Sequence, residues 1–312
     1  MRTLLSAAAL LVATAFGASA EAAQPLVSVD WLEAHLGQPN LVVLDVRSPE
    51  KGQPADLFER AHIPGAVHAD YAKAGWRTTI NGVPGMLPPK ADLEKLIGGL
   101  GIDNKSHVVI VPAGTDSTEF GDATRVYWTF KVVGHENVSI LDGGFRAWTA
   151  DRTVPLEAGP SAPKAKSFVA TIQPRYLATK AEVQQALKDG TKLIDARPAA
   201  QYEGTAKSPV VKSYGTLPGA VNLEHSSLVS KDTGKFASSG TVKTLLAKLG
   251  VTSEGKEIAF CNTGHWASVA WFAASEVAGN KSAKMYDGSM AEWTADAADP
   301  VERKAPVTAE KK

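Results

Sequence analysis

The chain has 312 residues, and its 33 Lys and Arg side chains balance its 33 Asp and Glu side chains. This length predicts about two globular domains, and the even charge argues against a nucleic-acid or anionic-membrane partner. The single cysteine excludes an internal disulfide and any CxxC dithiol chemistry.

The start of the chain has the pattern of an export signal. Arg2 precedes an apolar run over residues 4–16, and the small residues 18–20 follow. The run is too short to span a bilayer, so a membrane anchor is the less favoured alternative. We expect a signal peptide over residues 1–20, with cleavage after Ala20 or, second, after Ala23. The mature protein is therefore expected in the periplasm, without a membrane segment.

Strand and helix patterns alternate through the first half of the mature chain. Ser28 is expected to cap a short helix that ends at Leu36. Continuous apolar runs, typical of buried parallel strands, predict strands over residues 41–46, 107–111 and 137–141. Helical periodicity predicts helices over residues 91–100 and 121–133.

The second half repeats this order after a Pro/Ala/Lys-rich stretch, residues 157–166, which we interpret as interdomain linker. Thr179 and Glu182 form a capping box that opens a helix. Strands are predicted over residues 192–196, 257–260 and 283–286, and helices over residues 241–249 and 267–278. The charged end of the chain is expected to be mobile.

Three short motifs recur in the same order in both halves. They are Asp-x-Arg at 45–47 and 195–197, Pro-Gly-Ala-Val at 64–67 and 218–221, and Asp-Gly-x-x-x-x-Trp at 142–148 and 287–293. The sequence therefore predicts a duplicated α/β unit, in which each domain is a mainly parallel sheet flanked by helices. The expected domains are residues 25–156 and 176–298, joined by a linker over 157–175 and followed by a mobile tail over 299–312.

Cys261 stands where the strand 257–260 ends and a polar loop, residues 262–266, begins. A strand, a tight loop and a helix together aim backbone N–H groups and a helix dipole at one point, which stabilises a thiolate. The alternative is a small buried hydrophobe, the commoner role of a lone cysteine. The matching position in the first half is Pro112 or a near neighbour, so the N-terminal domain is expected to be catalytically silent.

The ordered, repeated motifs and the cysteine that opens a glycine-containing loop resemble the rhodanese family, over nearly the whole mature chain. The resemblance implies a two-domain sulfurtransferase in which Cys261 takes a sulfane sulfur from a donor and passes it, as a persulfide, to a thiophilic acceptor. The site residues that we assign are the nucleophile Cys261, the loop residues Asn262, Thr263, Gly264, His265, Trp266 and Ala267, and the supporting residues Asp195, Arg197 and Gln201.

Some roles within this site stay open at this point. His265 is expected either to supply a hydrogen-bond donor or positive charge at the loop rim, or to tether the loop. For Arg197 and Asp195 a structural ion pair is favoured over contact with substrate, because the silent half has the same pair. Gln201 stands where family members often have an arginine, and the loop lacks both the Arg or Lys of thiosulfate enzymes and the Gly-Ser pattern of mercaptopyruvate enzymes. Either donor is compatible with the sequence.

Two other functions compete. Cysteine phosphatases and arsenate reductases need an arginine six residues after the cysteine, where this chain has Ala267. A non-catalytic sulfur carrier or binding module in the periplasm remains an alternative. No metal-ligand spacing, Walker loop or GxGxxG pattern is present, so neither a metal nor another cofactor is expected. The expected partners are a small sulfur donor and a thiophilic acceptor, with the protein a monomer.

Overall fold

A computed structural model describes residues 23–150, 154–252 and 254–305 of the chain. The predicted signal peptide lies outside these residues, as does the end of the predicted tail. Among the described residues, no helix is both long enough and apolar enough to cross a membrane.

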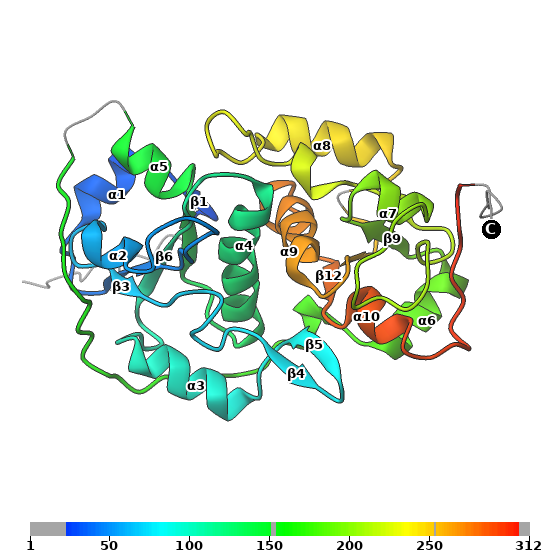
Figure 1. Cartoon of the computed structure of the whole chain (residues 1–312), viewed down its shortest axis with the longest axis horizontal. Coiled ribbons are helices and arrows are strands. Elements are labelled where there is room, and N and C mark those ends of the chain that lie inside the picture. Colours follow the sequence, from blue (N-terminus) through cyan, green and yellow to red (C-terminus); the bar gives the residue numbers. More distant parts are fainter. Residues whose placement is uncertain (1–22, 151–153, 253, 306–312) are drawn as a thin grey trace, which may run out of the picture.

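The N-terminal half forms a five-stranded parallel sheet in the order β1-β7-β6-β2-β3 (Figure 1). Its strands are β1 (Leu26–Val27), β2 (Leu41–Asp45), β3 (Val67–His68), β6 (His107–Val111) and β7 (Val138–Leu141). Its helices are α1 (Val29–His35), α2 (Leu57–Arg60), α3 (Lys90–Gly99), α4 (Ser117–Val132) and α5 (Gly144–Thr149). An antiparallel hairpin of β4 (Thr78–Ile80) and β5 (Val83–Met86) is added to this half.

The C-terminal half repeats the sheet in the order β10-β9-β11-β12-β8, again with every pair parallel. Its strands are β8 (Leu177–Ala178), β9 (Lys192–Asp195), β10 (Val221–Asn222), β11 (Glu257–Phe260) and β12 (Ala283–Tyr286). Its α-helices are α6 (Lys180–Asp189), α7 (Ala199–Glu203), α8 (Ser239–Lys248), α9 (His265–Phe272) and α10 (Ser289–Trp293). Short helices η1 (Pro174–Tyr176) and η2 (His225–Ser227) and a π-helical turn η3 (Ala273–Val277) complete it. The predicted α/β duplication is confirmed.

The predicted elements are present in the structure, and four helices begin one to four residues earlier than predicted: α3, α4, α8 and α9. Helix α4 starts at Ser117 because the Asp116 carboxylate caps the free N–H groups of Thr118 and Glu119. Helix α9 starts at His265, with Gly264 at the N-cap in a left-handed conformation. The predicted capping box of Thr179 and Glu182 is formed.

The core is layered. Alternate residues of β6 face opposite sides of the sheet, so Val108 and Ile110 join a central apolar cluster while Val109 and Val111 join an outer one. On β11, Ile258 and Phe260 face the second outer cluster. The central cluster is shared by both domains, and α4 and α9 run side by side through it (Figure 1). The two halves are therefore packed against each other through an apolar interior.

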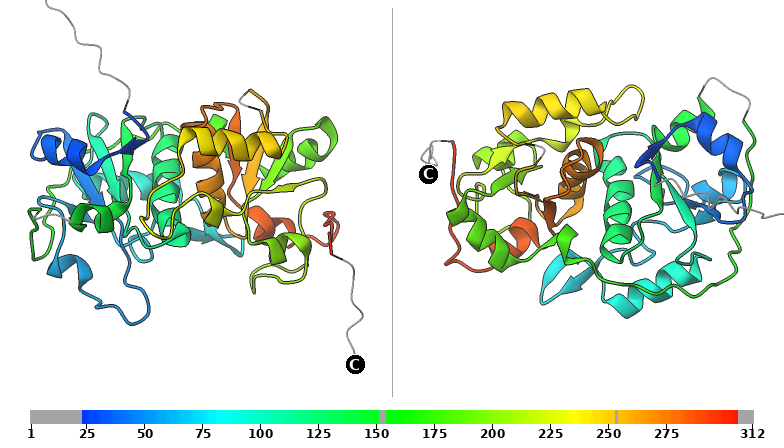
Figure 2. Two further views of the ribbon diagram at one scale, coloured as in Figure 1. Left: turned by 90° about the horizontal axis from the view of Figure 1, so that it is seen from above. Right: turned by 180° about the vertical axis from the view of Figure 1, so that it is seen from behind.

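Two N-terminal segments extend beyond their own sheet. The β4–β5 hairpin projects toward the C-terminal domain, and β5 contacts α10 (Figure 1). The segment over residues 154–173, drawn in green, runs along the outside of the N-terminal domain before it enters the second half (Figure 2). Backbone hydrogen bonds hold this segment, from Lys166 N to Gly98 O and from Thr171 N to Val133 O. The predicted linker is thus fixed along the first domain.

The beginning of the predicted mobile tail is bound to the C-terminal domain, which corrects the sequence expectation for residues 299–305. Glu302 and Thr216 exchange two backbone hydrogen bonds, of 2.8 and 2.9 Å. The N–H groups of Lys304 and Ala305 donate to Glu203 O. A charged composition alone did not reveal these backbone partners, which lie about 100 residues earlier in the chain.

Candidate active site

Cys261 directly follows β11, the middle strand of the C-terminal sheet. Its side chain belongs to the central cluster with Ala259, so it points toward the N-terminal domain. The residue is only 1% exposed. It nevertheless lines a cavity of about 750 Å³ between the two domains. Small molecules can therefore reach the thiol through this cavity.

Backbone pairing identifies the position in the silent half that matches Cys261. In the C-terminal domain, Met290 N donates to Cys261 O at 3.0 Å. In the N-terminal domain, Phe145 N donates to Pro112 O at 2.8 Å. The next pair repeats the pattern, since Ala291 N binds Asn262 O and Arg146 N binds Ala113 O. Pro112 is thus the structural counterpart of Cys261.

Ser289 holds the active loop, and sequence analysis did not single it out. Its Oγ accepts hydrogen bonds from the N–H groups of Cys261 and Gly264, both at 3.1 Å, and donates to Tyr286 O at 2.8 Å. Ser289 has a φ of +49°, which is unusual for a residue other than glycine. Its counterpart in the repeat is Gly144, with a φ of +61°. The change from Asp-Gly-Gly to Asp-Gly-Ser was the sequence signal for this residue.

The silent loop shows what its backbone amides can bind. The Glu119 carboxylate accepts hydrogen bonds from the N–H groups of Ala113 and, at 2.8 Å, Gly114. Burial raises the pKa of Glu119 to about 7, although the N–H donors oppose that shift. A carboxylate thus occupies the point on which the loop amides converge.

The same point is left open in the C-terminal domain. Glu119 is the third residue of α4, and the third residue of α9 is Ala267. The N–H groups of Asn262 and Thr263, which match those of Ala113 and Gly114, have no hydrogen-bond acceptor among the described residues. Together with the first N–H groups of α9, they leave unpaired backbone donors in the loop that follows Cys261, the arrangement that favours an anion at a helix N-terminus.

The N-terminal domain supplies the positive charge that the loop lacks. Arg77 lines the cavity, and its Nη2 donates to Thr263 O and, at 2.8 Å, to Thr263 Oγ1. Its Nε donates to Gly85 O in the hairpin at 3.0 Å. Lys73 also lines the cavity, at its exposed rim. Sequence analysis missed Arg77 because it lies 184 residues before Cys261, outside any motif.

His265 is a neutral tether. Its Nε2 donates to Thr118 O at 2.8 Å, which leaves Nδ1 to accept a hydrogen bond of 2.9 Å from the Tyr71 hydroxyl. Burial, with the nearby Arg77 guanidinium as a smaller cause, lowers the pKa of His265 to about 3. The imidazole fits over Gly121, where a Cβ would lie 2.7 Å from Nε2. Of the expected roles, the geometry supports tethering, and the lowered pKa disfavours a positive charge at the rim.

Trp266 contacts residues of both domains, and Asn262 is bound within the C-terminal domain. The Trp266 Nε1 donates to Thr118 Oγ1 at 3.2 Å, and its ring stacks on His225 with centroids 4.4 Å apart. The Asn262 Nδ2 donates to Gln201 Oε1 at 2.8 Å. Gln201 therefore contacts the loop through Asn262 and is not among the cavity-lining residues.

Asp195 and Arg197 form a fully buried ion pair beneath the loop. Arg197 Nη2 lies 2.6 Å from Asp195 Oδ2 and also donates to Gly215 O. Thr216 Oγ1 donates to the same carboxylate at 2.7 Å. Asp45 and Arg47 repeat the pair in the silent domain. Neither Asp195 nor Arg197 lines the cavity, so the pair joins strand ends to loops.

The structure brings most of the predicted loop to one cavity and corrects two positions. Cys261, Asn262, Thr263, His265 and Trp266 line it. Gly264 and Ala267 do not, because Gly264 turns the backbone over Arg125 and Ala267 is fully buried in α9.

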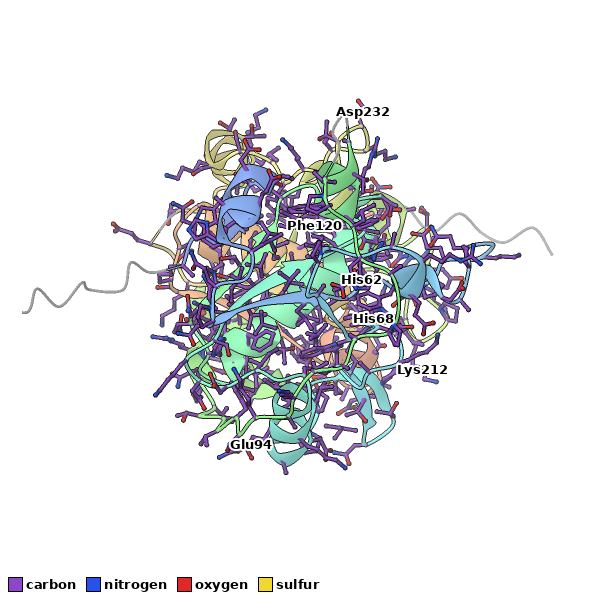
Figure 3. All side chains as sticks on the ribbon, turned by 90° about the vertical axis from the view of Figure 1, so that its left-hand side faces the viewer. His62, His68, Glu94, Phe120, Lys212 and Asp232 are labelled. Carbon is purple, nitrogen blue, oxygen red and sulfur yellow. The ribbon has the colours of Figure 1, made fainter. Side chains whose placement is uncertain are left out.

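The histidines of the first half lie away from this cavity. His62 and His68 are adjacent on the face of the N-terminal domain in Figure 3, and both stack on Phe58, with ring centroids 3.9 and 4.5 Å from it. Their rings pack within the first domain, so they support its fold.

Comparisons with known proteins agree with this geometry. The model of the rhodanese-like domain matches residues 28–151 and 179–296. Thiosulfate sulfurtransferases of Mus musculus and Rattus norvegicus are 34% and 33% identical to this chain, over 86% of it and 91% of their own lengths. The 3-mercaptopyruvate sulfotransferase SseA from Escherichia coli superposes with a TM-score of 0.71 at 27% identity, over 85% of this chain and 98% of its own. Tum1 from Saccharomyces cerevisiae, at 21% identity and a TM-score of 0.75, shares the fold over 91% of this chain and 99% of its own.

Proposed function

The chain belongs to the rhodanese family and is a sulfurtransferase, and we propose that it moves a sulfane sulfur from thiosulfate to a thiophilic acceptor through a persulfide on Cys261. The single observation that carries the proposal is the pair of matched loops. A carboxylate fills the amide-lined point of the silent loop, whereas the loop of Cys261 leaves the matching amides free.

The first half-reaction needs no proton transfer. The Cys261 thiolate attacks the outer sulfur of thiosulfate, the S–S bond breaks, and sulfite leaves with the electron pair. The product is an anionic persulfide, Cys261–S–S⁻. The N–H groups of Asn262 and Thr263 stabilise the charge on the thiolate and on the persulfide, because fixed amide dipoles need no reorganisation during the reaction.

Arg77 favours a small dianionic donor. Its guanidinium lies on the cavity wall beside Thr263, where a sulfonate can approach it while the outer sulfur faces Cys261. Mercaptopyruvate has a carboxylate at the other end from its sulfur and can use the same cation. Steady-state turnover measured with thiosulfate and with mercaptopyruvate separates the two donors.

The test is turnover of wild type, Cys261→Ser and Cys261→Ala with thiosulfate or mercaptopyruvate and cyanide as acceptor. Thiocyanate should form with thiosulfate and be lost in both variants, and mass spectrometry should find one added sulfur on wild type alone. Loading of Cys261 without turnover would support a sulfur carrier instead. Equal turnover of wild type and variants would refute the assignment.

We also propose that the protein is exported to the periplasm after cleavage behind Ala20 and that it acts there as a monomer. Support comes from the charged, apolar and small-residue pattern of residues 1–20 and from a cavity that is complete within one chain. N-terminal sequencing of the protein from a periplasmic extract tests the cleavage site, and a full-length protein confined to the cytoplasm would contradict it. Sedimentation tests the oligomeric state.

A further inference from the structure

One carboxyl group of the N-terminal domain lines the same cavity as Cys261 and has no role in holding the fold. The side-chain carboxyl of Asp122, on the second turn of α4, makes no hydrogen bond with any described residue. His265 Nε2 lies 3.8 Å from Asp122 Oδ1, beyond hydrogen-bond distance, and that N–H is already bound to Thr118 O. The Asp122 side chain is 14% exposed and lines the cavity, through which solvent reaches it.

The surroundings favour the neutral form of this carboxyl. Burial, with smaller repulsion from Glu119, Asp70 and Asp116, raises the pKa of Asp122 to about 9, and only Arg77 opposes the shift appreciably. From α9 it faces the neutral His265. A neutral carboxyl does not repel an anionic donor, and it presents both a proton donor and a proton acceptor.

We propose that Asp122 is a catalytic residue that relays a proton when the sulfur acceptor is a thiol. This inference rests on the proposed persulfide route. A thiol differs from cyanide in one respect, because its S–H proton must leave as the new S–S bond forms. Among the residues that line the cavity, Asp122 is the carboxyl group placed to receive that proton.

The step balances without any co-reactant. The acceptor sulfur bonds to the outer sulfur of Cys261–S–S⁻, and its proton passes to the unprotonated oxygen of Asp122. The proton on the other oxygen passes to the outer sulfur, so the product leaves as R–S–SH. The bond between the outer sulfur and Cys261 breaks, and its electron pair returns to the Cys261 thiolate among the loop amides. Asp122 ends neutral, as it began.

The test compares two acceptors on one donor. Sulfite release from thiosulfate is measured with cyanide and with 2-mercaptoethanol, on wild type, Asp122→Asn and Asp122→Ala. The Asn amide keeps the polarity of the side chain and the Ala methyl removes it, and neither relays a proton at neutral pH. We expect the kcat with the thiol to fall about 100-fold or more, while the kcat with cyanide stays within about threefold.

Asp56→Asn is the control, because Asp56 is an exposed carboxylate of the N-terminal domain that binds Arg60 and does not line the cavity. Its ratio of thiol to cyanide rates should equal that of wild type. Equal losses with both acceptors in the two Asp122 variants, or no loss with the thiol, would overturn the proton relay. Absence of cyanide turnover in wild type would instead refute the proposed function, so the two failures are distinguishable.

Discussion

Arg125 of the N-terminal domain and Asp287 of the C-terminal domain form an ion pair of 2.6 Å that is almost completely buried at the back of the active loop. The same guanidinium donates to Gly264 O in the loop and to Gly85 O in the hairpin, both at 3.2 Å. The Asp287 carboxylate also accepts the N–H of Leu87 at 2.6 Å. The silent domain therefore fixes the loop of the active domain.

This pair gives the first prediction. Arg125→Met leaves the Asp287 charge buried without its partner, which should lower the free energy of unfolding by about 3–5 kcal/mol. Urea unfolding followed by circular dichroism measures the loss. Arg60→Met, which breaks an exposed pair with Asp56, is the control and should leave stability essentially unchanged. A variant of Arg125 as stable as wild type would contradict the role of the pair.

Ala267→Glu should convert the active loop into a copy of the silent one. The new carboxylate is placed to accept the N–H groups of Asn262 and Thr263, as Glu119 does in the first domain. Loss of preorganised donors of this kind lowers turnover about 100-fold or more. Ala267→Ser, which is too short to reach the amides, should retain most activity. Full turnover in a folded Ala267→Glu protein would show that these amides do not serve the reaction.

Arg77→Met tests the donor site. Removing a charged hydrogen-bond donor from the cavity should lower kcat/KM for thiosulfate about 10- to 100-fold, mainly through KM. Lys73→Met should have a much smaller effect, because Lys73 is exposed and paired with Asp70 at 3.1 Å. The measurement is initial-rate kinetics across a thiosulfate series. A fall in kcat at constant KM would instead indicate that Arg77 acts by holding Thr263.

The pH dependence of stability should be set in part by Glu257, on the first position of β11. Burial raises the pKa of its carboxyl to about 8, and neither oxygen has a hydrogen-bond partner among the described residues. A raised pKa in the folded state means that the carboxyl favours folding below its unfolded pKa near 4.5 and that this contribution is lost as pH rises through 8.

Glu257→Gln should remove that dependence. The variant should exceed wild type in Tm at pH 9 and lose the advantage at pH 5, where both side chains are neutral in the folded state. Calorimetry at the two pH values checks the sign. A wild type that is more stable at pH 9 than at pH 5 relative to the variant would contradict the assignment.

Much of this protein was predictable from the sequence because the information is local. Continuous apolar runs predicted the strands that begin at residues 41 and 107, since a strand buried on both faces is mostly apolar, and the repeated order of elements predicted those that begin at residues 192, 257 and 283. The repeated motifs predicted the duplication and placed Cys261 opposite Pro112 or a near neighbour, and backbone pairing in the structure identified Pro112. In the sequence, Ser289 appears only as one of four differences between the two copies of the Asp-Gly-x-x-x-x-Trp motif, and the hydrogen bonds in the structure show that it holds the loop.

Only the tertiary structure decided what surrounds the sulfur. Arg77, Asp122 and Tyr71 come from the N-terminal domain and line the same cavity as the loop that follows Cys261. They do so because α4 packs along α9 where the two domains meet. Periodicity records which side of an element is buried, and it does not record which distant element covers that side. The same packing made His265 a neutral tether and set the carboxyl of Asp122 beside the cavity, so the charge of the site follows from contacts between residues more than 140 positions apart.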